Sequence, residues 1–460
     1  MIDIVVIAAV SSAILLAVWR LRSGTRLRTV SLLLILGTVA ISAIARGLEP
    51  TRDRSQFVTR LPAAHANQSR VQDPAPRVLV IGIDGLEWRA IEGLVRTGQL
   101  PTIEALLDRG RFFQLDNRQM AVSPQIWTAL YTGYPESANS VGGFSEWQFV
   151  GASRPVAFVP RFGVHGIWML DELLKKLVLL GGWREQEVTT MRIVKPPVWS
   201  IASSSGRRVV IIDPVPFFVI GERVNGIFAW PSGDWYRVSR RASFDAPATI
   251  VDEPLPINDS SSPASHDFDE RARVDLTMRY FADIRPDLGV YYTHFVDSIA
   301  HNNWDFRFPD SWFGGDPHAE LASSFDATTI ANAYRQADAH IRDLVASFGP
   351  GTVILVSDHG WEFNEYKHFL SPHGVLIIAN TGATGYGGVV DVLSVAPTIL
   401  SLLRLPIANG MQPPIAEVTA ALGATSAYDG LRQDFVIEDR LVVDPERRRL
   451  LKSLGYLSGQ

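Results

Sequence analysis

Acidic residues and histidines gather in three short motifs of the 460-residue sequence. Asp84 ends the first motif, Asp297 and His301 lie four residues apart in the second, and Asp358 and His359 are adjacent in the third. On a helix, a spacing of four residues aims two side chains at a common point. Carboxylates and imidazoles in this mixture suit zinc first, with manganese or another divalent ion as the alternative. The chain contains no cysteine, so a thiolate metal site is excluded.

Each motif also has a purely structural explanation. An aspartate before Gly85 is often a turn residue, Asp297 and His301 can form a surface pair, and an Asp-His pair can belong to a loop. Two more histidines, His368 and His373, follow the third motif. Because all three motifs come at the ends of apolar segments, their joint occurrence favours a functional site.

Ser123 is the candidate nucleophile. Pro124 follows it and is typical of a first helical position, so we expect the Ser123 side chain at the helix N-cap. Free backbone amides and the helix dipole favour an anion there. A serine with only a capping role has the same pattern.

Short apolar runs alternate with amphipathic segments, which predicts an α/β fold with a mostly parallel central sheet flanked by helices. The residues that follow such strands lie at the sheet edge where α/β proteins place their chemistry. The expected strands are 77–85, 208–213, 288–294 and 352–357, and the expected helices are 328–348 and 390–403. Residues from about 150 to 285 are rich in tryptophan and irregular, and we expect them to form an inserted cap over the sheet edge.

The N-terminal region predicts a membrane anchor. Two apolar runs at 4–19 and 30–45 flank a short loop with four arginines, which is typical of a transmembrane helical hairpin with a cytoplasmic loop. A signal peptide lacks its basic n-region here, and a buried soluble hairpin is the other alternative. The catalytic domain is therefore expected to be periplasmic or extracellular, anchored in the inner or plasma membrane.

The expected organisation is a hairpin at 1–46, a proline-containing linker at 47–76, a catalytic domain at 77–435 and a tail at 436–460. The hydrophobic content of 47% is sufficient for a large core. The net charge of -5 gives no general attraction to nucleic acid, so we expect no nucleic-acid polymer as a partner.

The ordered motifs resemble the type I phosphodiesterase/nucleotide pyrophosphatase family of the alkaline phosphatase superfamily. They are Asp84-Gly85, the run from Ser123-Pro124 to Thr132-Gly133, Asp297 with His301, and Asp358-His359-Gly360. Ser123 lies ten residues before Gly133, where relatives carry their nucleophile. The resemblance implies two divalent metal ions. Asp297, His301 and a later histidine, preferably His368, would bind one, and Asp84, Ser123, Asp358 and His359 would bind the other.

The loop after Pro135 departs from the family pattern. Relatives usually carry a His-Gly pair there, and nucleotide pyrophosphatases carry an oxyanion-supporting asparagine near the position of Gly143. Neither is present, and Asn139 can replace that asparagine only if the loop is rearranged. The departure weakens the expectation of a nucleotide substrate more than that of a metal-dependent hydrolase.

The sequence therefore predicts a hydrolase of phosphate esters that forms a phosphoseryl intermediate on Ser123. One alternative is a membrane phosphotransferase with a lipid or glycan acceptor, and another is a catalytically silent binding module. A sulfatase is disfavoured because the chain lacks the Cys/Ser-x-Pro-x-Arg motif at Ser123.

Overall fold

The computed structural model describes most of the chain after residue 75. The described residues are 76–118, 120, 122–149, 183–214, 221–232, 235–242, 247–254, 263–303, 327–361, 373–420, 422–431 and 433–435. The predicted membrane spans, the C-terminal tail and His368 lie outside these ranges. Within them, no helix combines the length and the apolar character that crossing a bilayer requires.

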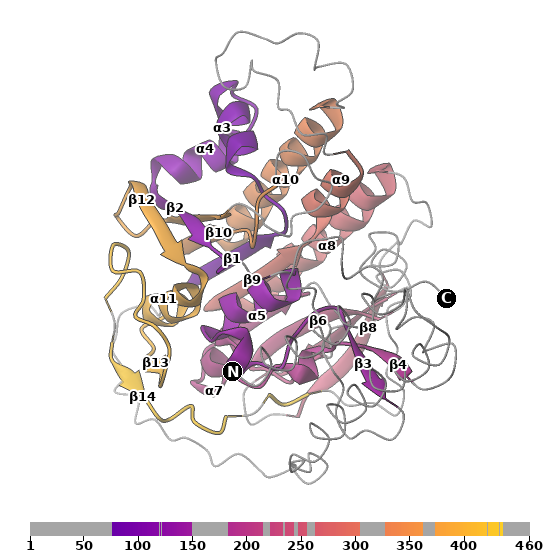
Figure 1. The fold of residues 1–460 in the computed structure, drawn as a ribbon, viewed down its shortest axis with the longest axis vertical. Helices are drawn as coiled ribbons and strands as arrows, with labels where there is room; N and C mark the ends of the chain where they lie inside the picture. Colours follow the sequence, from indigo (N-terminus) through magenta and orange to yellow (C-terminus); the bar gives the residue numbers. More distant parts are fainter. Residues whose placement is uncertain are drawn as a thin grey trace, which may run out of the picture. The chain divides into compact units, whose positions relative to one another are not determined.

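A large sheet organises the described chain (Figure 1). In spatial order its strands are β12 (Gly385–Asp391), β2 (Gly110–Asp116), β11 (Gly374–Ala379), β10 (Thr352–Val356), β1 (Val78–Ile83), β9 (Leu288–Thr293), β5 (Val209–Ile212), β6 (Gly226–Ser232), β7 (Trp235–Arg240) and β8 (Thr249–Pro254). The central strands β10, β1, β9, β5 and β6 are mutually parallel, and antiparallel pairs lie toward both sides. The α/β prediction is confirmed, since β1, β5, β9 and β10 match the four expected strands.

Helices cover both faces of this sheet because its central strands are apolar on both sides. In β1, Val78 and Val80 enter one core, and Leu79 and Ile81 enter the other. The first core includes α5 (Ser123–Thr132), α7 (Val198–Ser204) and α11 (Val395–Leu402). The second includes α3 (Trp88–Arg96), α4 (Pro101–Asp108), α8 (Pro263–Ile284), α9 (Phe295–Asn303) and α10 (Ala327–Phe348).

Short elements complete the description. β3 (Ser145–Phe149) and β4 (Trp183–Glu187) form a two-stranded sheet of their own, as do β13 (Ile407–Ala408) and β14 (Ala424–Thr425). The 3-10 helices are η1 (Glu136–Ala138), η2 (Thr190–Arg192) and η4 (Val392–Ser394).

Two segments differ from the sequence prediction. The expected helix 390–403 starts only at Val395, because Val390 and Asp391 pair with β2 and the Asp391 side chain accepts a hydrogen bond from Leu393 N at 2.9 Å. The described part of 150–285 is also more regular than expected. It supplies β5 to β8 to the large sheet, and α7 and α8 to the two layers, whereas an inserted cap was expected there.

Candidate functional site

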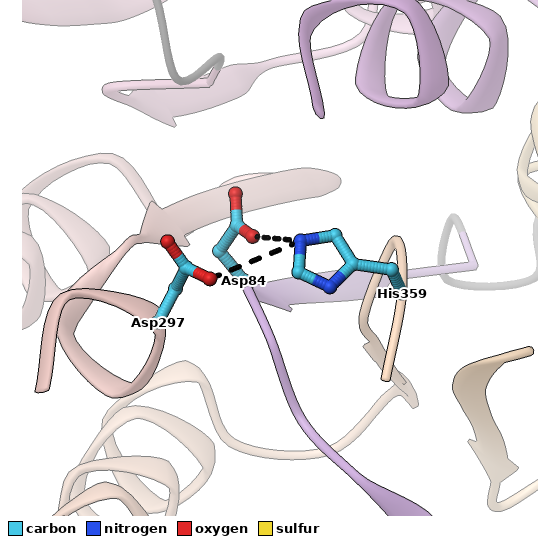
Figure 2. A group of neighbouring side chains, drawn as sticks. All are labelled: Asp84, Asp297 and His359. Atoms are coloured by element: carbon cyan, nitrogen blue, oxygen red, sulfur yellow. Dashed lines mark ion pairs between the residues drawn. The ribbon is translucent and has the colours of Figure 1, made fainter. Parts of the chain in front are cut away.

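Three adjacent strands bring the predicted site residues together. Asp84 follows β1 directly, Asp297 lies in the first turn of α9 after β9, and His359 follows β10. His359 Nε2 lies 3.1 Å from Asp84 Oδ1 and 3.9 Å from Asp297 Oδ1 (Figure 2). All three side chains are buried. The carboxyl ends of neighbouring parallel strands thus converge on one point, as the sequence pattern predicted.

Two further predicted residues join this group. Asp358 is completely buried, and its Oδ2 lies 3.5 Å from His359 Nε2. His301 Nε2 lies 3.4 Å from Asp297 Oδ2, across one turn of α9. Asp297 is therefore placed between the two histidines. We call Asp84, Asp297, His301, Asp358 and His359 the carboxylate–histidine group.

Gly85 permits the close approach of Asp84 and Asp297. Its φ of 72° lies in the left-handed region, which glycine adopts without strain. A Cβ at this position would lie 3.0 Å from Asp297 Cβ, tighter than most Cβ contacts, so Asp297 would have to shift by a small amount. The Asp-Gly pair therefore both turns the chain after β1 and leaves room for α9.

The loops after β1 and β10 are tied together by hydrogen bonds. The Ser357 hydroxyl accepts from Leu86 N and donates to the His359 carbonyl, both at 2.9 Å. Glu87 Oε2 accepts from Trp361 N at 2.8 Å. Leu86 and Ser357 are 271 residues apart in sequence, and Glu87 and Trp361 are 274 residues apart. These hydrogen bonds hold Asp84 and His359 in a fixed relation.

Hydrogen bonds also orient the ligand atoms. Trp127 Nε1 and the Tyr292 hydroxyl both donate to Asp84 Oδ2, at 3.1 and 2.9 Å, so Asp84 Oδ1 is left to face His359. His359 Nδ1 lies 3.0 Å from the Gly360 carbonyl, which can only accept, so Nδ1 carries a proton and Nε2 faces the carboxylates. Partners of this kind fix the tautomer and direction of metal ligands.

The ionisation of the group reflects crowded negative charge. Burial raises the pKa of Asp358 well above its usual range, and the charge of Asp84 raises it further. Burial lowers the pKa of His359, but the charges of Asp358 and Asp84 outweigh this effect and raise it to about 10. Burial raises the pKa of Asp84, but the hydrogen bond to His359 outweighs it, and the net pKa is lowered.

The donor set fits a divalent cation. Asp297 Oδ1 and both carboxylate oxygens of Asp358 are buried and accept no hydrogen bond within the described part of the chain. Leaving a buried charged oxygen without a donor is costly unless a cation compensates it. Three carboxylates and two imidazoles are also a typical oxygen and nitrogen ligand set for zinc.

The position of Ser123 differs by one residue from the prediction. Val122, which is extended with φ -148° and ψ 146°, is the N-cap of α5, and Ser123 is the first helical residue. The Val122 carbonyl accepts from Gln125 N at 3.0 Å, as the carbonyl of an N-cap residue does. The prediction that Ser123 is the N-cap was therefore wrong.

The helical spacing of α5 indicates which way Ser123 faces. Ser123 and Trp127 are four residues apart and so share a helix face, and Trp127 contacts Asp84. The Ser123 side chain is buried, at 5% exposure. Trp127 and Tyr292 were missed as site residues by the sequence prediction. The signals for them were a tryptophan one helical turn after Ser123 and a tyrosine near the carboxyl end of β9.

Asn139 has a structural role in the departing loop. Its Nδ2 donates to Thr132 Oγ1 at 2.9 Å and to the Tyr134 carbonyl at 3.3 Å, and its Oδ1 accepts from Lys195 N at 3.1 Å. Both ends of the amide are occupied, so the rearranged loop that would present Asn139 to a substrate is not the one observed. His373, the competitor of His368, has an exposed side chain and pairs with His359 only through the backbone.

Comparisons with solved structures give several matches of low identity. Murine ectonucleotide pyrophosphatase/phosphodiesterase 5 is 12% identical, with 74% of this chain and 97% of that chain covered and a TM-score of 0.43. Phosphonoacetate hydrolase from Sinorhizobium meliloti is 16% identical, with 62% and 57% covered and a TM-score of 0.36. A sulfatase of glycosaminoglycan metabolism in Bacteroides thetaiotaomicron is 11% identical, with 72% and 73% covered and a TM-score of 0.41.

The sequence comparison is decisive for the family. A search of curated protein sequences gave no match. Residues 78–376 match the family model described as type I phosphodiesterase/nucleotide pyrophosphatase, and this range includes every described member of the carboxylate–histidine group as well as Ser123. The chain therefore belongs to the type I phosphodiesterase/nucleotide pyrophosphatase family of phosphoric ester hydrolases, in the alkaline phosphatase superfamily.

Proposed function

We propose that the protein hydrolyses phosphate esters with two divalent cations, zinc in the first instance, and with Ser123 as the nucleophile. The observation that carries this proposal is the convergence of three buried carboxylates and two histidines at the ends of β10, β1 and β9. Several of their oxygens have no hydrogen-bond donor in the described chain, which supports a cation as their partner.

The ligands divide into two sets around Asp297. Asp84 Oδ1 and Asp358 Oδ2 lie 3.1 and 3.5 Å from His359 Nε2, and these three residues, with Ser123, would bind one cation. Asp297 and His301, which are 3.4 Å apart, would bind the other together with His368. The cations would supply positive charge for the non-bridging oxygens of the phosphoryl group and would lower the pKa of hydroxyl groups bound to them.

The chain's own residues position the reaction in two displacements. In the first, Ser123 Oγ attacks phosphorus, an O–P bond forms to the serine, and the ester O–P bond breaks to release the alcohol. In the second, water attacks the phosphoseryl group and breaks the O–P bond to the serine. This step releases inorganic phosphate from a monoester substrate or a phosphomonoester from a diester, and a proton restores the Ser123 hydroxyl. The N-terminal end of α5 favours negative charge beside Ser123 in both steps.

Replacement of the nucleophile tests this proposal. Ser123→Ala in the full chain should lower turnover of nitrophenyl mono- and diesters by about 10^4-fold or more, with bound metal nearly unchanged. Ser137→Ala is the matched control, because Ser137 is an exposed serine in η1 of the following loop. Full metal-dependent turnover by Ser123→Ala would contradict the assignment.

The cellular position belongs to the same proposal. We place the catalytic domain outside the cytoplasm, on the basis of the arginine-rich loop between the two apolar runs at 4–19 and 30–45. Protease digestion of intact and permeabilised cells tests it, and cleavage of the domain only after permeabilisation of the inner or plasma membrane would contradict it. The transferase alternative differs in its product, because a lipid or glycan acceptor would then carry the phosphoryl group.

A further inference from the structure

One edge of the large sheet, opposite the site, can be defined from strand pairing. Val78 pairs with both Thr352 and Leu288, and Leu288 pairs with Val209, so these strand starts lie in one row. The pairings Val209↔Gly226, Ile227↔Arg240, Val353↔Ala379, Ala379↔Gly110 and Arg111↔Gly385 extend the row in both directions. Asp84, Asp297 and His359 follow the other ends of these strands.

Arginines border this row along its whole length. Those at or beside the starts and ends of the strands and helices concerned, which we call the basic edge, are Arg77, Arg109, Arg111, Arg207, Arg208, Arg223, Arg240, Arg241, Arg285 and Arg404. Arg109, Arg208, Arg240, Arg285 and Arg404 are exposed. The acids of the same described segments are fewer, and they are Asp108, Asp283, Asp287 and Asp434.

A structural role explains part of this arrangement. Helix C-termini point toward the row, and arginines donate to backbone carbonyls there: Arg207 Nη2 to Leu403 at 2.8 Å, Arg208 Nη1 to Ile284 at 3.0 Å and Arg77 Nε to Pro286 at 2.9 Å. These acceptors carry no formal charge, so the contacts satisfy hydrogen bonds but leave the positive charges in place.

The charges of the basic edge also act on one another. Burial lowers the pKa of Arg77, and the neighbouring charges of Arg208 and Arg285 lower it further, against the opposing charge of Asp287. Asp434 pairs with Arg223 at 2.9 Å and with Arg241 at 3.2 Å, and Asp283 lies 3.8 Å from Arg240, so these acids neutralise part of the edge. The other arginines of the basic edge outnumber its remaining acids, Asp108 and Asp287, and leave it with an excess of positive charge. Arg77 also lines a hollow of about 390 Å³ with Pro76, Pro350, Gly351, Thr352 and Asn380.

We propose that the basic edge rests on a membrane surface of anionic phospholipid. Charge complementarity is the first argument, since clustered arginines near a bilayer attract acidic head groups. The second is where the described chain begins: Pro76 and Arg77 lead into β1 at this edge, after a linker and the predicted hairpin at 1–46. A tether that enters here attaches the domain to the bilayer from the side of the basic edge. Nucleic acid is a poorer partner because the chain as a whole carries a net charge of -5.

This orientation has a consequence for the substrate. The six residues of β1 separate the basic edge from Asp84, which corresponds to about 20 Å of extended chain. The site residues then lie at the sheet edge away from the lipid, which favours an ester dissolved in the aqueous phase over a lipid of the same bilayer. The proposal rests on surface charge and on the proposed membrane anchor but not on Ser123 chemistry, so it stands or fails independently of the catalytic assignment.

The absence of cysteine allows a direct test with single-cysteine labels on the full chain. Ala282→Cys places a fluorophore on an exposed position in the last turn of α8, near the basic edge, and Arg118→Cys places one beyond the carboxyl end of β2. The protein is reconstituted in vesicles of phosphatidylcholine, alone or with about a quarter phosphatidylglycerol, that contain an acceptor-labelled lipid. We expect a larger loss of donor fluorescence at 282 than at 118, seen in anionic vesicles and reversed by about 0.5 M NaCl.

Charge variants complete the test. Arg109→Gln, Arg285→Gln and Arg404→Gln together should abolish the difference between anionic and neutral vesicles, since these exposed arginines carry no described ion pair. Glutamine keeps a long side chain at the positive φ of Arg285 and Arg404, so folding is not put at new risk. Arg96→Gln, Arg335→Gln and Arg342→Gln remove equal charge from α3 and α10 and should leave the difference intact. The proposal would be overturned if donor fluorescence at position 282 fell equally in anionic and neutral vesicles, or if the two triple variants changed this fluorescence equally. It would also be overturned if the protein bound RNA while its fluorescence did not differ between the two kinds of vesicle.

Discussion

At the carboxyl edge of the sheet, buried aspartates face one another with too few hydrogen-bond donors, whereas at the opposite edge exposed arginines donate to backbone carbonyls. The same strands run between the two edges. At the basic edge some arginines have an ordinary structural role, and five of them are exposed to solvent. At the carboxyl edge several buried carboxylate oxygens have no hydrogen-bond donor in the described chain, and their burial therefore costs folding free energy.

The comparison distinguishes charged groups that stabilise the fold from buried charged groups that lower its stability. Asp338 shows how a buried aspartate is normally satisfied, because its carboxylate accepts from Thr102 N at 3.1 Å and Ile103 N at 2.8 Å at the start of α4. Asp358, equally buried, has no such donor in the described chain. A residue kept in that state is expected to serve a bound ligand.

Asp358→Asn gives the largest expected effect. Turnover should fall by roughly 10^3-fold or more as a cation ligand is lost. The metal-free protein should gain about 1–3 kcal/mol of unfolding free energy near neutral pH, because burial makes the Asp358 carboxyl harder to ionise in the folded chain than in the unfolded chain and asparagine removes this cost. Phosphate-ester turnover and urea unfolding in chelator measure the two effects. Asp338→Asn, the matched control, should lose stability and keep its turnover. A destabilised metal-free Asp358→Asn would break the contrast between the two aspartates.

Trp127→Phe should have the next largest effect. It removes the 3.1 Å hydrogen bond to Asp84 Oδ2, and loss of such a supporting partner typically lowers metal affinity or activity by about 10- to 100-fold. Trp199→Phe is its counterpart away from the site, since Trp199 Nε1 donates to Glu222 at 3.0 Å. That variant should lose about 1–3 kcal/mol of stability with little change in kcat/KM. Equal turnover of the two variants would show that Trp127 does not orient Asp84.

Gly85→Ala should reduce turnover about tenfold, because the added methyl group displaces Asp297. Gly98→Ala is a close control: Gly98 has φ 68° against 72° for Gly85, but a Cβ there meets nothing within 4 Å. Both variants should lose about 1–2 kcal/mol through backbone strain. Thermal unfolding measures the backbone strain that both variants share. Turnover kinetics measure the displacement of Asp297, which only Gly85→Ala causes.

Glu222→Gln should leave turnover unchanged and alter only the pH dependence of stability. Burial raises the pKa of Glu222 from 4.5 to about 7, although Trp199, Ser200 and Gln433 donate hydrogen bonds that oppose the rise. A raised carboxyl pKa means that the folded state holds the proton more tightly. Its stabilising effect is therefore complete below pH 4.5 and is lost as the pH rises to about 7.

Above pH 7 the Glu222→Gln variant should be more stable than the parent chain by about 3 kcal/mol, and near pH 4 the two should differ little. Urea unfolding across this range measures the difference. A constant difference at all pH values would show that Glu222 does not titrate in the folded protein.

Sequence patterns predicted the site well because its chemistry follows local rules. Apolar runs that end in Asp84 or in Asp358 and His359 indicate buried parallel strands, whose carboxyl ends meet at one edge. The order of the strands, with antiparallel pairs beside the parallel centre, depends on long-range pairing and left no local signal.

Other misses have a similar cause. The N-cap of α5 is Val122 and not Ser123, because the extended Val122 supplies the first carbonyl acceptor. The Ser123-Pro124 pattern fits a helix that begins at either residue. Val390 and Asp391 looked helical because their apolar spacing suits a helix, but pairing with β2 decides their conformation. The role of Asn139 depends on Lys195, a partner 56 residues away.

Metal analysis of the full-length protein tests the central claim most directly. We predict two divalent cations per chain, zinc first among them, whose removal by chelator abolishes phosphate-ester turnover and whose return restores it. Full turnover in the chelator-treated, metal-free protein would contradict the account of the carboxylate–histidine group as the metal centre of a phosphoric ester hydrolase.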